Sequence, residues 1–226
     1  RANNQKNNAG VLNTASLCYS TRRSIALSVK NVLIIFIRNP ELGKVKTRLA
    51  RTLGDHEALR IYRFLLEKTR LAASGVRAER HLYYSENMAR EDDWPIALFH
   101  KKQQSNGDLG ERMESAFRNA FREGAEKVLI IGSDCPELSS TILDSAFELL
   151  EKADFVVGPV PDGGYYLLGM KEMTPSVFRD IAWSTETVRA ETLEKIEALG
   201  KSYALLPELT DIDEATDWLD YQSRAK

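Results

Sequence analysis

The feature that most constrains this chain is a regular alternation of two hydrophobic patterns that begins at Asn31. Continuous apolar runs are typical of buried strands, and they occupy residues 31–38, 80–85, 98–103, 127–134, 154–160, 164–170 and 202–207. Apolar residues recur at helical spacing in residues 56–75, 108–124, 139–153, 184–200 and 213–225. Because crossover helices connect parallel strands, the pattern predicts an α/β fold with a mostly parallel sheet and helices on both faces.

Two expected strands depart from the alternation. The loop between residues 154–160 and 164–170 is too short to contain a helix, so one of these strands is expected to run antiparallel to its neighbours. No repeat and no low-complexity linker interrupts the chain after residue 31. The prediction is therefore a single domain from residue 31 to residue 226.

The first thirty residues differ in composition from the rest. Residues 1–30 contain no Asp or Glu and are rich in Asn, Ser and Thr. An acid-poor segment that contains Arg and Ser is compatible with a transit peptide, but a disordered amino-terminal extension accounts for the same composition, and we adopt that interpretation.

Composition excludes several classes of protein. The formal net charge of −2 offers no broad basic face for nucleic acid. No apolar run approaches the roughly 18 residues that a membrane span needs. The two cysteines, Cys18 and Cys135, do not form a disulfide framework, which favours a reducing cytoplasm.

An aspartate follows one of the most apolar runs, in the stretch VLIIGSDCPEL from Val128 to Leu138. Asp134 could simply form a turn or cap the next helix. Pro136 and the expected cap residue Ser139 indicate that this helix begins later, which leaves Asp134 free to face the crevice where open α/β sheets bind ligands. Mg²⁺ needs few protein carboxylates when phosphates supply the other oxygens, so Asp134 is a candidate metal ligand.

A basic segment follows the first expected strand. The stretch RNPELGKVKTRL contains Arg38, Lys44, Lys46 and Arg48. The loop after the first strand is a common phosphate-binding position in α/β proteins, although neither the Walker pattern nor G-x-G-x-x-G is present. The segment is thus either a clamp for an anionic ligand or a solvated basic turn.

Two further stretches contain candidate site residues. Asp162, Gly163 and Gly164 form either a hairpin turn or a loop that brings backbone close to a ligand, and the two interpretations are compatible. Asp211 and Asp213 flank Ile212, so in an extended segment both point the same way and could complete a metal site with Asp134. Alternatively, Asp213 caps the last helix.

Six short motifs occur in an order that resembles a known family. They are KTRLA, GDLGERM, GSDCPEL, GPVPDGGYYLLG, WST and DIDEATD. The chain resembles the bacterial glycosyltransferase-like family described as radical SAM/selenodomain-associated transferases, which have the GT-A fold of nucleotide-diphospho-sugar transferases. Its KTRL and DIDEATD elements also look like those of phospholactate and molybdenum-cofactor guanylyltransferases. The resemblance covers about residues 31–222.

The resemblance implies a role for each candidate. Arg38, Lys44, Lys46 and Arg48 would bind the nucleotide. Asp134, with Asp213 or Asp211, would hold Mg²⁺ or Mn²⁺ on its phosphates. Asp162, Gly163 and Gly164 would lie near the sugar or the acceptor. The sequence departs from the family pattern where Gly132 stands at the first position of a D-x-D pair, and a G-x-G-x-R loop is missing.

The resemblance also implies the reaction. The leading expectation is a metal-dependent glycosyltransferase of the bacterial cytoplasm that moves a sugar from a nucleotide-sugar to a small acceptor, with Asp162 as the candidate base. The alternative is a nucleotidyltransferase that joins an NTP to a phosphorylated acceptor and releases pyrophosphate. A third hypothesis is a nucleotide-binding module without catalysis. Neither a nucleic-acid partner nor a transmembrane segment is expected.

Overall fold

The computed structural model describes residues 30–89 and 91–224. The extension expected over residues 1–30 lies outside the described residues except for Lys30. The strands are β1 (Asn31–Ile37), β2 (Glu79–Tyr84), β3 (His100–Gln103), β4 (Lys127–Ile131), β5 (Phe155–Pro159), β6 (Tyr165–Met170) and β7 (Tyr203–Leu205). The helices are α1 (Thr47–Leu53), α2 (Asp55–Gly75), α3 (Leu109–Arg122), α4 (Ser140–Leu149), the 3₁₀ turn η1 (Pro175–Phe178), α5 (Val188–Ala198) and α6 (Ala215–Arg224).

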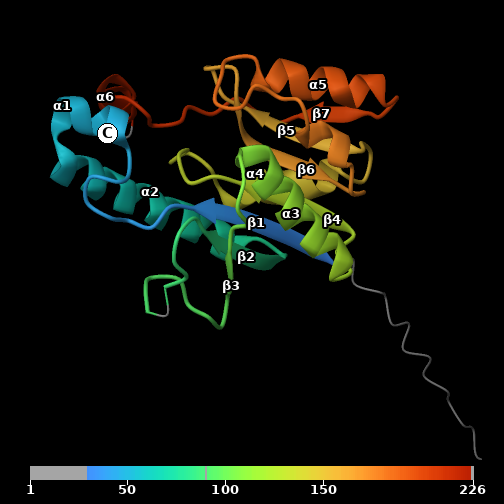
Figure 1. Ribbon diagram of the computed structural model, residues 1–226, viewed down its shortest axis with the longest axis horizontal. Coiled ribbons are helices and arrows are strands. Elements are labelled where there is room, and N and C mark those ends of the chain that lie inside the picture. Colours follow the sequence, from blue (N-terminus) through green and yellow to red (C-terminus); the bar gives the residue numbers. More distant parts are fainter. Residues whose placement is uncertain (1–29, 90, 225–226) are drawn as a thin grey trace, which may run out of the picture.

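The strands form one seven-stranded sheet in the order β3-β2-β1-β4-β6-β5-β7 (Figure 1). β6 runs antiparallel to both β4 and β5, and the other neighbouring pairs are parallel. The predicted α/β fold with one antiparallel strand is therefore confirmed. Ile35 of β1 lies opposite Ile131 of β4, so the segments that follow these two strands leave the sheet at the same edge.

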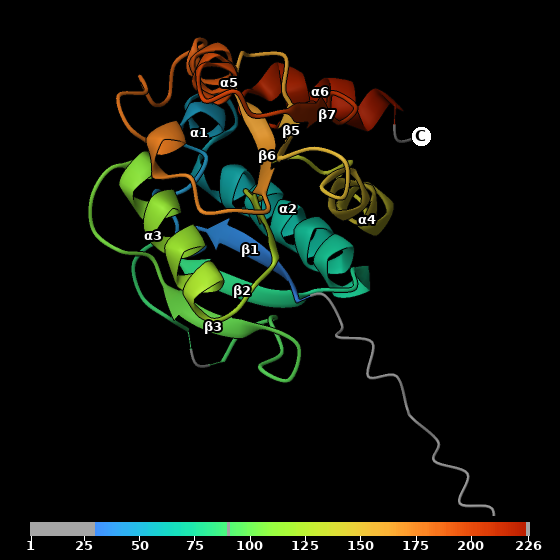
Figure 2. The ribbon, with the colours of Figure 1, turned by 90° about the vertical axis from the view of Figure 1, so that its right-hand side faces the viewer.

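Helices cover both faces of the sheet (Figure 2). On one face, apolar side chains of the sheet pack against α2 and α4. On the other face they pack against α3, η1 and α5. A smaller apolar cluster, which includes Leu49, Ile61, Ile212 and Trp218, joins α1 and α2 to the carboxyl-terminal segment. This cluster fixes the start of α1 and the approach to α6 beside the same edge of the sheet.

Two helix starts follow the sequence prediction. Asp108 accepts the N–H of Glu111, and the Glu111 side chain accepts the N–H of Asp108, which is a capping box at the start of α3. The Ser139 side chain accepts the N–H of Ile142 and caps α4. The Ser139 cap and the start of the helix near Asp108 were both expected, because such signals depend on residues that are close in sequence.

Three expectations about helices were wrong. The basic segment is not all loop, because α1 begins at Thr47. The helix expected over residues 184–200 begins only at Val188. The Asp213 side chain does not cap α6. The Asp217 carboxylate accepts the N–H groups of Asp213 and Glu214 instead.

None of the helices in the described part of the chain combines the length and the apolar character needed to cross a bilayer.

Candidate active site

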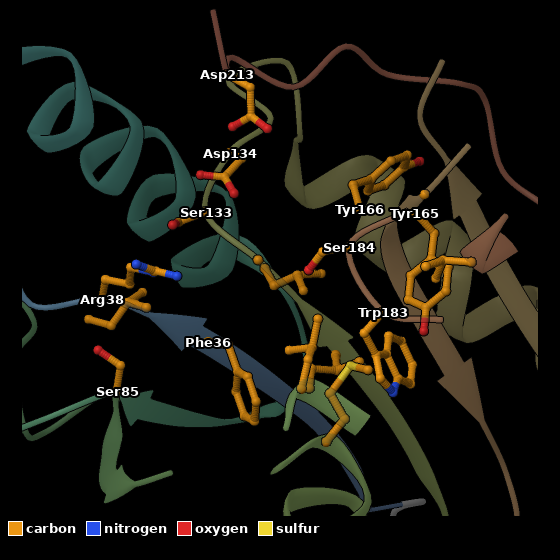
Figure 3. A pocket seen from close by; sticks show the side chains of 18 of the residues that line it. Phe36, Arg38, Ser85, Ser133, Asp134, Tyr165, Tyr166, Trp183, Ser184 and Asp213 are labelled. Carbon is orange, nitrogen blue, oxygen red and sulfur yellow. The ribbon is translucent and has the colours of Figure 1, made fainter. Parts of the chain in front are cut away.

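A cleft of about 700 Å³ opens at the edge of the sheet where β1 and β4 end (Figure 3). It is lined by residues that follow these two strands, by the start of α1, by the hairpin between β5 and β6, and by the segment before α5. Of the residues proposed from the sequence, the lining includes Arg38, Lys46, Arg48, Asp134, Asp162, Gly164 and Asp213. Segments far apart in the sequence therefore meet at one crevice, as expected for an open α/β sheet.

A buried lysine joins two of the candidate metal ligands. The Lys46 Nζ atom lies 2.6 Å from Asp134 Oδ1 and 2.9 Å from Asp213 Oδ1. The Lys46 side chain is only 7% exposed, whereas the side chains of Asp134 and Asp213 are 46% and 35% exposed. An ammonium group thus occupies the space between two carboxylates that remain open to the cleft.

The local backbone explains how these three groups meet. Lys46 precedes α1 in a left-handed conformation, with φ 47° and ψ 47°, which is uncommon for a residue with a side chain. Asp134 follows β4, and its carbonyl oxygen accepts the N–H of Ile212 at 2.9 Å. Because the Ile212 side chain is fully buried, this bond fixes the chain just before Asp213 beside the end of β4.

The charges of this cluster shift its pKa values. Burial alone would lower the pKa of Lys46, but the two carboxylates outweigh it and hold the pKa above its usual value. Burial would raise the pKa of Asp213, and the ammonium of Lys46 lowers it overall. Both groups are therefore charged near neutral pH, and the pair is an ion pair rather than a neutral hydrogen bond.

Asp211 does not share this arrangement. Burial, together with the neighbouring carboxylates of Asp213, Asp162 and Asp134, raises the pKa of Asp211 to about 6. Asp211 does not line the cleft, and within residues 30–89 and 91–224 no three His, Cys, Asp or Glu side chains gather closely enough to hold an ion. The structure therefore brings together Asp134 and Asp213, but it does not add Asp211 to them.

The other basic residues have different surroundings. Arg48 lies 3.4 Å from Asp213 Oδ2 on the exposed side of the cluster. Arg38 lines the cleft (Figure 3), and its backbone is fixed because its N–H donates to the Tyr62 hydroxyl, which in turn donates to its carbonyl. Lys44 lies outside the lining of the cleft, where it pairs with Glu41 and Glu86.

The Asp162-Gly163-Gly164 segment is a hairpin turn and a wall of the cleft at once. It joins the antiparallel strands β5 and β6, and the Asp162 carboxylate accepts the N–H of Gly164 at 2.9 Å. Gly163 has φ 90°, and a Cβ atom there would collide with the carbonyl oxygen of Glu186. Both readings of this loop are thus compatible with the structure, and Gly163 is required by its backbone angle and by close packing.

One wall of the cleft was not predicted from the sequence. Trp183 and Ser184 line the cleft together with Phe36, and they are labelled around it in Figure 3. Ser184 is exposed and has φ 66°, a strained conformation of the kind found at functional sites. Two sequence motifs, WST and GDLG, could have indicated this wall. Gly110 of the second motif leaves the space that the indole ring of Trp183, in the first motif, fills.

The hairpin is hydrogen-bonded to α5, the helix that follows the segment with Trp183 and Ser184. Arg189 donates its backbone N–H to the carbonyl of Gly163 at 2.9 Å and its guanidinium to the carbonyl of Val160 at 2.9 Å. These bonds hold Asp162 and Ser184 on neighbouring parts of the cleft. On one side of the cleft, the ammonium of Lys46 contacts the carboxylates of Asp134 and Asp213. The other side is lined by the indole ring of Trp183, the hydroxyl of Ser184 and the carboxylate of Asp162.

The Asp134–Asp213 pair fits a divalent cation by its chemistry. Two carboxylates from different elements already hold a cationic group between them, and both keep surface open to the cleft. Mg²⁺ commonly takes one or two protein carboxylates and completes its octahedron with water and substrate phosphates. A third protein carboxylate is therefore not needed.

Comparison with known proteins gives the family. A family model described as "Uncharacterized protein conserved in bacteria (DUF2064)" matches residues 69–185, which is more than half of the chain. The chain belongs to the DUF2064 family. Curated proteins offer no match to this sequence.

Several solved structures share the fold of this DUF2064 chain. A proposed nucleotide-diphospho-sugar transferase from Desulfovibrio desulfuricans G20 is 32% identical, with a TM-score of 0.79 over 86% of this chain and 87% of that chain. A 4-diphosphocytidyl-2C-methyl-D-erythritol synthase is 13% identical, with a TM-score of 0.56 over 89% and 100%. A cytidylyltransferase from Leptospira borgpetersenii serovar Hardjo-bovis (strain JB197) is 16% identical, with a TM-score of 0.50 over 86% of each chain. The last two similarities concern the fold alone.

Proposed function

We propose that this DUF2064 protein is a metal-dependent glycosyltransferase that moves a sugar from a nucleotide-sugar to a small acceptor. The observation that carries the proposal is the Lys46 ammonium held between Asp134 and Asp213 at the strand edge of the cleft. It marks a position where two carboxylates bind a cation next to further basic side chains. The 32% identity to the Desulfovibrio protein supports sugar transfer over other reactions of the fold.

In this proposal the two carboxylates hold Mg²⁺ or Mn²⁺ on the donor diphosphate. The bound ion would supply positive charge against the negative charge that develops on the departing phosphate oxygen. Lys46, Arg48 and Arg38 contact the nucleotide and add to the same stabilisation.

The acceptor end is assigned to the hairpin. During transfer a bond forms between the acceptor oxygen and the anomeric carbon, while the bond from that carbon to the diphosphate breaks. Asp162 takes the proton that the acceptor hydroxyl loses, and its position on the cleft wall makes it the candidate base. Gly163 and Gly164 allow the backbone beside it to approach the sugar or the acceptor.

One observation favours a second candidate, nucleotidyl transfer from an NTP to a phosphorylated acceptor. The Asp162 carboxylate already accepts the N–H of Gly164, so it is partly engaged within its own turn. An attacking phosphate needs no protein base, and such a reaction would proceed without Asp162.

The experiment is incubation of the full chain with Mn²⁺ and a panel of labelled nucleotide-sugars and NTPs. Release of a nucleoside diphosphate from a nucleotide-sugar supports glycosyl transfer, and release of pyrophosphate supports nucleotidyl transfer. Asp134→Asn is the negative control, and Asp144→Asn on α4 is the matched surface control. Nucleotide binding without turnover of any donor would leave only a binding module.

A further inference from the structure

The ammonium of Lys46 occupies the space that a metal ion would take. Its Nζ atom contacts one oxygen of Asp134 and one oxygen of Asp213, and its side chain is almost completely buried. Two cations cannot share these oxygens at such distances, because like charges in a partly buried site repel strongly. A metal ion that binds Asp134 and Asp213 must therefore displace Lys46.

The displaced ammonium needs a new anionic partner. A buried lysine that loses both carboxylates keeps the cost of its desolvation without compensation. Among the described residues, the Lys46 ammonium forms salt bridges with Asp134 and Asp213 alone. A phosphate group that arrives with the metal supplies the missing charge and lies within the same cleft.

The balance of charge in this cluster also favours joint binding of a metal ion and a phosphate. Asp134 and Asp213 carry two negative charges, which Lys46 and Arg48 balance in the free protein. A divalent cation alone would add two positive charges to a balanced cluster. A divalent cation that arrives with a diphosphate brings negative charge that balances its own positive charge. Lys46 and Arg48 can then leave the carboxylates and contact the phosphates instead.

We propose that Lys46 is an internal counterion that blocks the Asp134–Asp213 site against free metal, so that this site binds a divalent cation only together with a nucleotide phosphate. The inference rests on the proposed function, because it assumes that these two carboxylates are the metal ligands. It adds that the ligand is the preformed metal–nucleotide complex, and that free Mn²⁺ binds weakly.

The test measures Mn²⁺ binding to the full chain by electron paramagnetic resonance without nucleotide. Lys46→Met removes the ammonium but keeps an unbranched side chain, and it is expected to bind Mn²⁺ at least about tenfold more tightly than the wild type, equivalent to about 1.4 kcal/mol. Lys44→Met is the matched control, since Lys44 is a lysine of the same segment that contacts neither aspartate. Its Mn²⁺ affinity is expected to equal that of the wild type.

A second measurement needs no variant and covers the case in which Lys46→Met fails to fold. Lysine acetylation is followed by mass spectrometry on the wild-type chain with and without millimolar Mn²⁺. The metal is expected to raise the modification rate of buried Lys46 and to leave that of exposed Lys44 unchanged. An unchanged rate at Lys46 while Mn²⁺ occupies the site would overturn the proposal.

The outcomes also separate this inference from the proposed function. If Lys46→Met binds Mn²⁺ no more tightly than the wild type, while Asp134→Asn abolishes binding of the Mn²⁺–nucleotide complex, only the counterion role fails. If Asp134→Asn leaves that binding unchanged, the metal site itself is wrong and both proposals fail. Tighter Mn²⁺ binding by Lys46→Met that disappears in the double variant with Asp134→Asn supports both.

Discussion

The two sides of the cleft are built by different physical means. On one side, the side chains of Lys46, Asp134 and Asp213 contact one another through opposite charges at 2.6 and 2.9 Å. On the other side, the hairpin around Asp162 and the segment around Ser184 are held by backbone hydrogen bonds and close packing. A cluster held by charge can change its partners when an ion or a phosphate arrives, whereas a wall held by backbone contacts keeps its shape. The first side is suited to exchange of ligands and the second to alignment of a substrate.

The largest effect on turnover is expected when one of the two carboxylates that contact Lys46 is removed. Asp134→Asn should lower metal-dependent turnover about 1000-fold, the upper scale for loss of one electrostatic stabiliser. The chain should stay folded, because the bond from Ile212 uses the backbone of Asp134, but its melting temperature should fall because the buried Lys46 ammonium loses one of its two carboxylates. Initial rates over a Mn²⁺ titration measure the effect, with Asp144→Asn as the surface control. Full activity at every Mn²⁺ concentration would show that Asp134 is only a turn residue.

The next effect is expected on the opposite wall. Asp162→Asn keeps the acceptor for the Gly164 N–H but removes the base, so kcat should fall about 100-fold while the nucleotide dissociation constant stays near that of the wild type. Steady-state kinetics and calorimetry check the two quantities. Glu186→Gln, which removes a carboxylate from the same wall, should keep a kcat close to that of the wild-type chain. If Asp162→Asn turns over normally, the hairpin has no catalytic carboxylate.

The packing of the hairpin against Glu186 can be tested by substituting two glycines that have similar backbone angles. Gly163 has φ 90° and meets Glu186, whereas Gly124 has φ 89° and nothing within 4 Å of an added Cβ atom. Gly163→Ala should therefore lower the free energy of unfolding by about 1–3 kcal/mol more than Gly124→Ala. Urea denaturation of both variants measures the difference. Equal losses would mean that the contact with Glu186 contributes nothing.

The smallest effect is expected at the exposed rim of the charged cluster. Arg48 is 59% exposed and contacts Asp213 at 3.4 Å, so Arg48→Ala should weaken nucleotide binding by only about 1 kcal/mol, roughly fivefold. Arg51→Ala in the same helix is the control, because Arg51 does not line the cleft. Calorimetric titration with nucleotide compares the two, and identical affinities would make Arg48 a solvated surface residue.

Local signals in the sequence were enough for most of the fold. The capping residues Asp108 and Ser139 act on N–H groups three positions ahead, and the short loop after Pro159 forces an antiparallel strand. The position of Asp134 at the edge of the sheet follows from the same reasoning. These features depend on residues that are close in sequence, so a pattern can reveal them.

The parts that the sequence did not reveal depend on distant contacts. Lys44 and Lys46 are the same residue type two positions apart, and only the left-handed backbone of Lys46 directs one of them to the carboxylates. Ser184 takes its strained conformation in a segment fixed by contacts with the hairpin some twenty positions earlier. Spacing alone cannot distinguish such residues from a solvated turn.

The 167 positions that separate Lys46 from Asp213 have a consequence for biosynthesis. The ribosome makes Lys46 well before the Asp213 carboxylate that completes its neutralisation. A chain that ends before residue 212 can still pair β1 with β2 and β4, but it lacks both the Asp213 carboxylate and the Ile212 bond to the end of β4. Such a truncated product would retain a buried ammonium that is only half compensated, and its lower stability would expose it to proteolysis. The ion pair thus makes the stability of the Lys46 segment depend on residues that are synthesised much later.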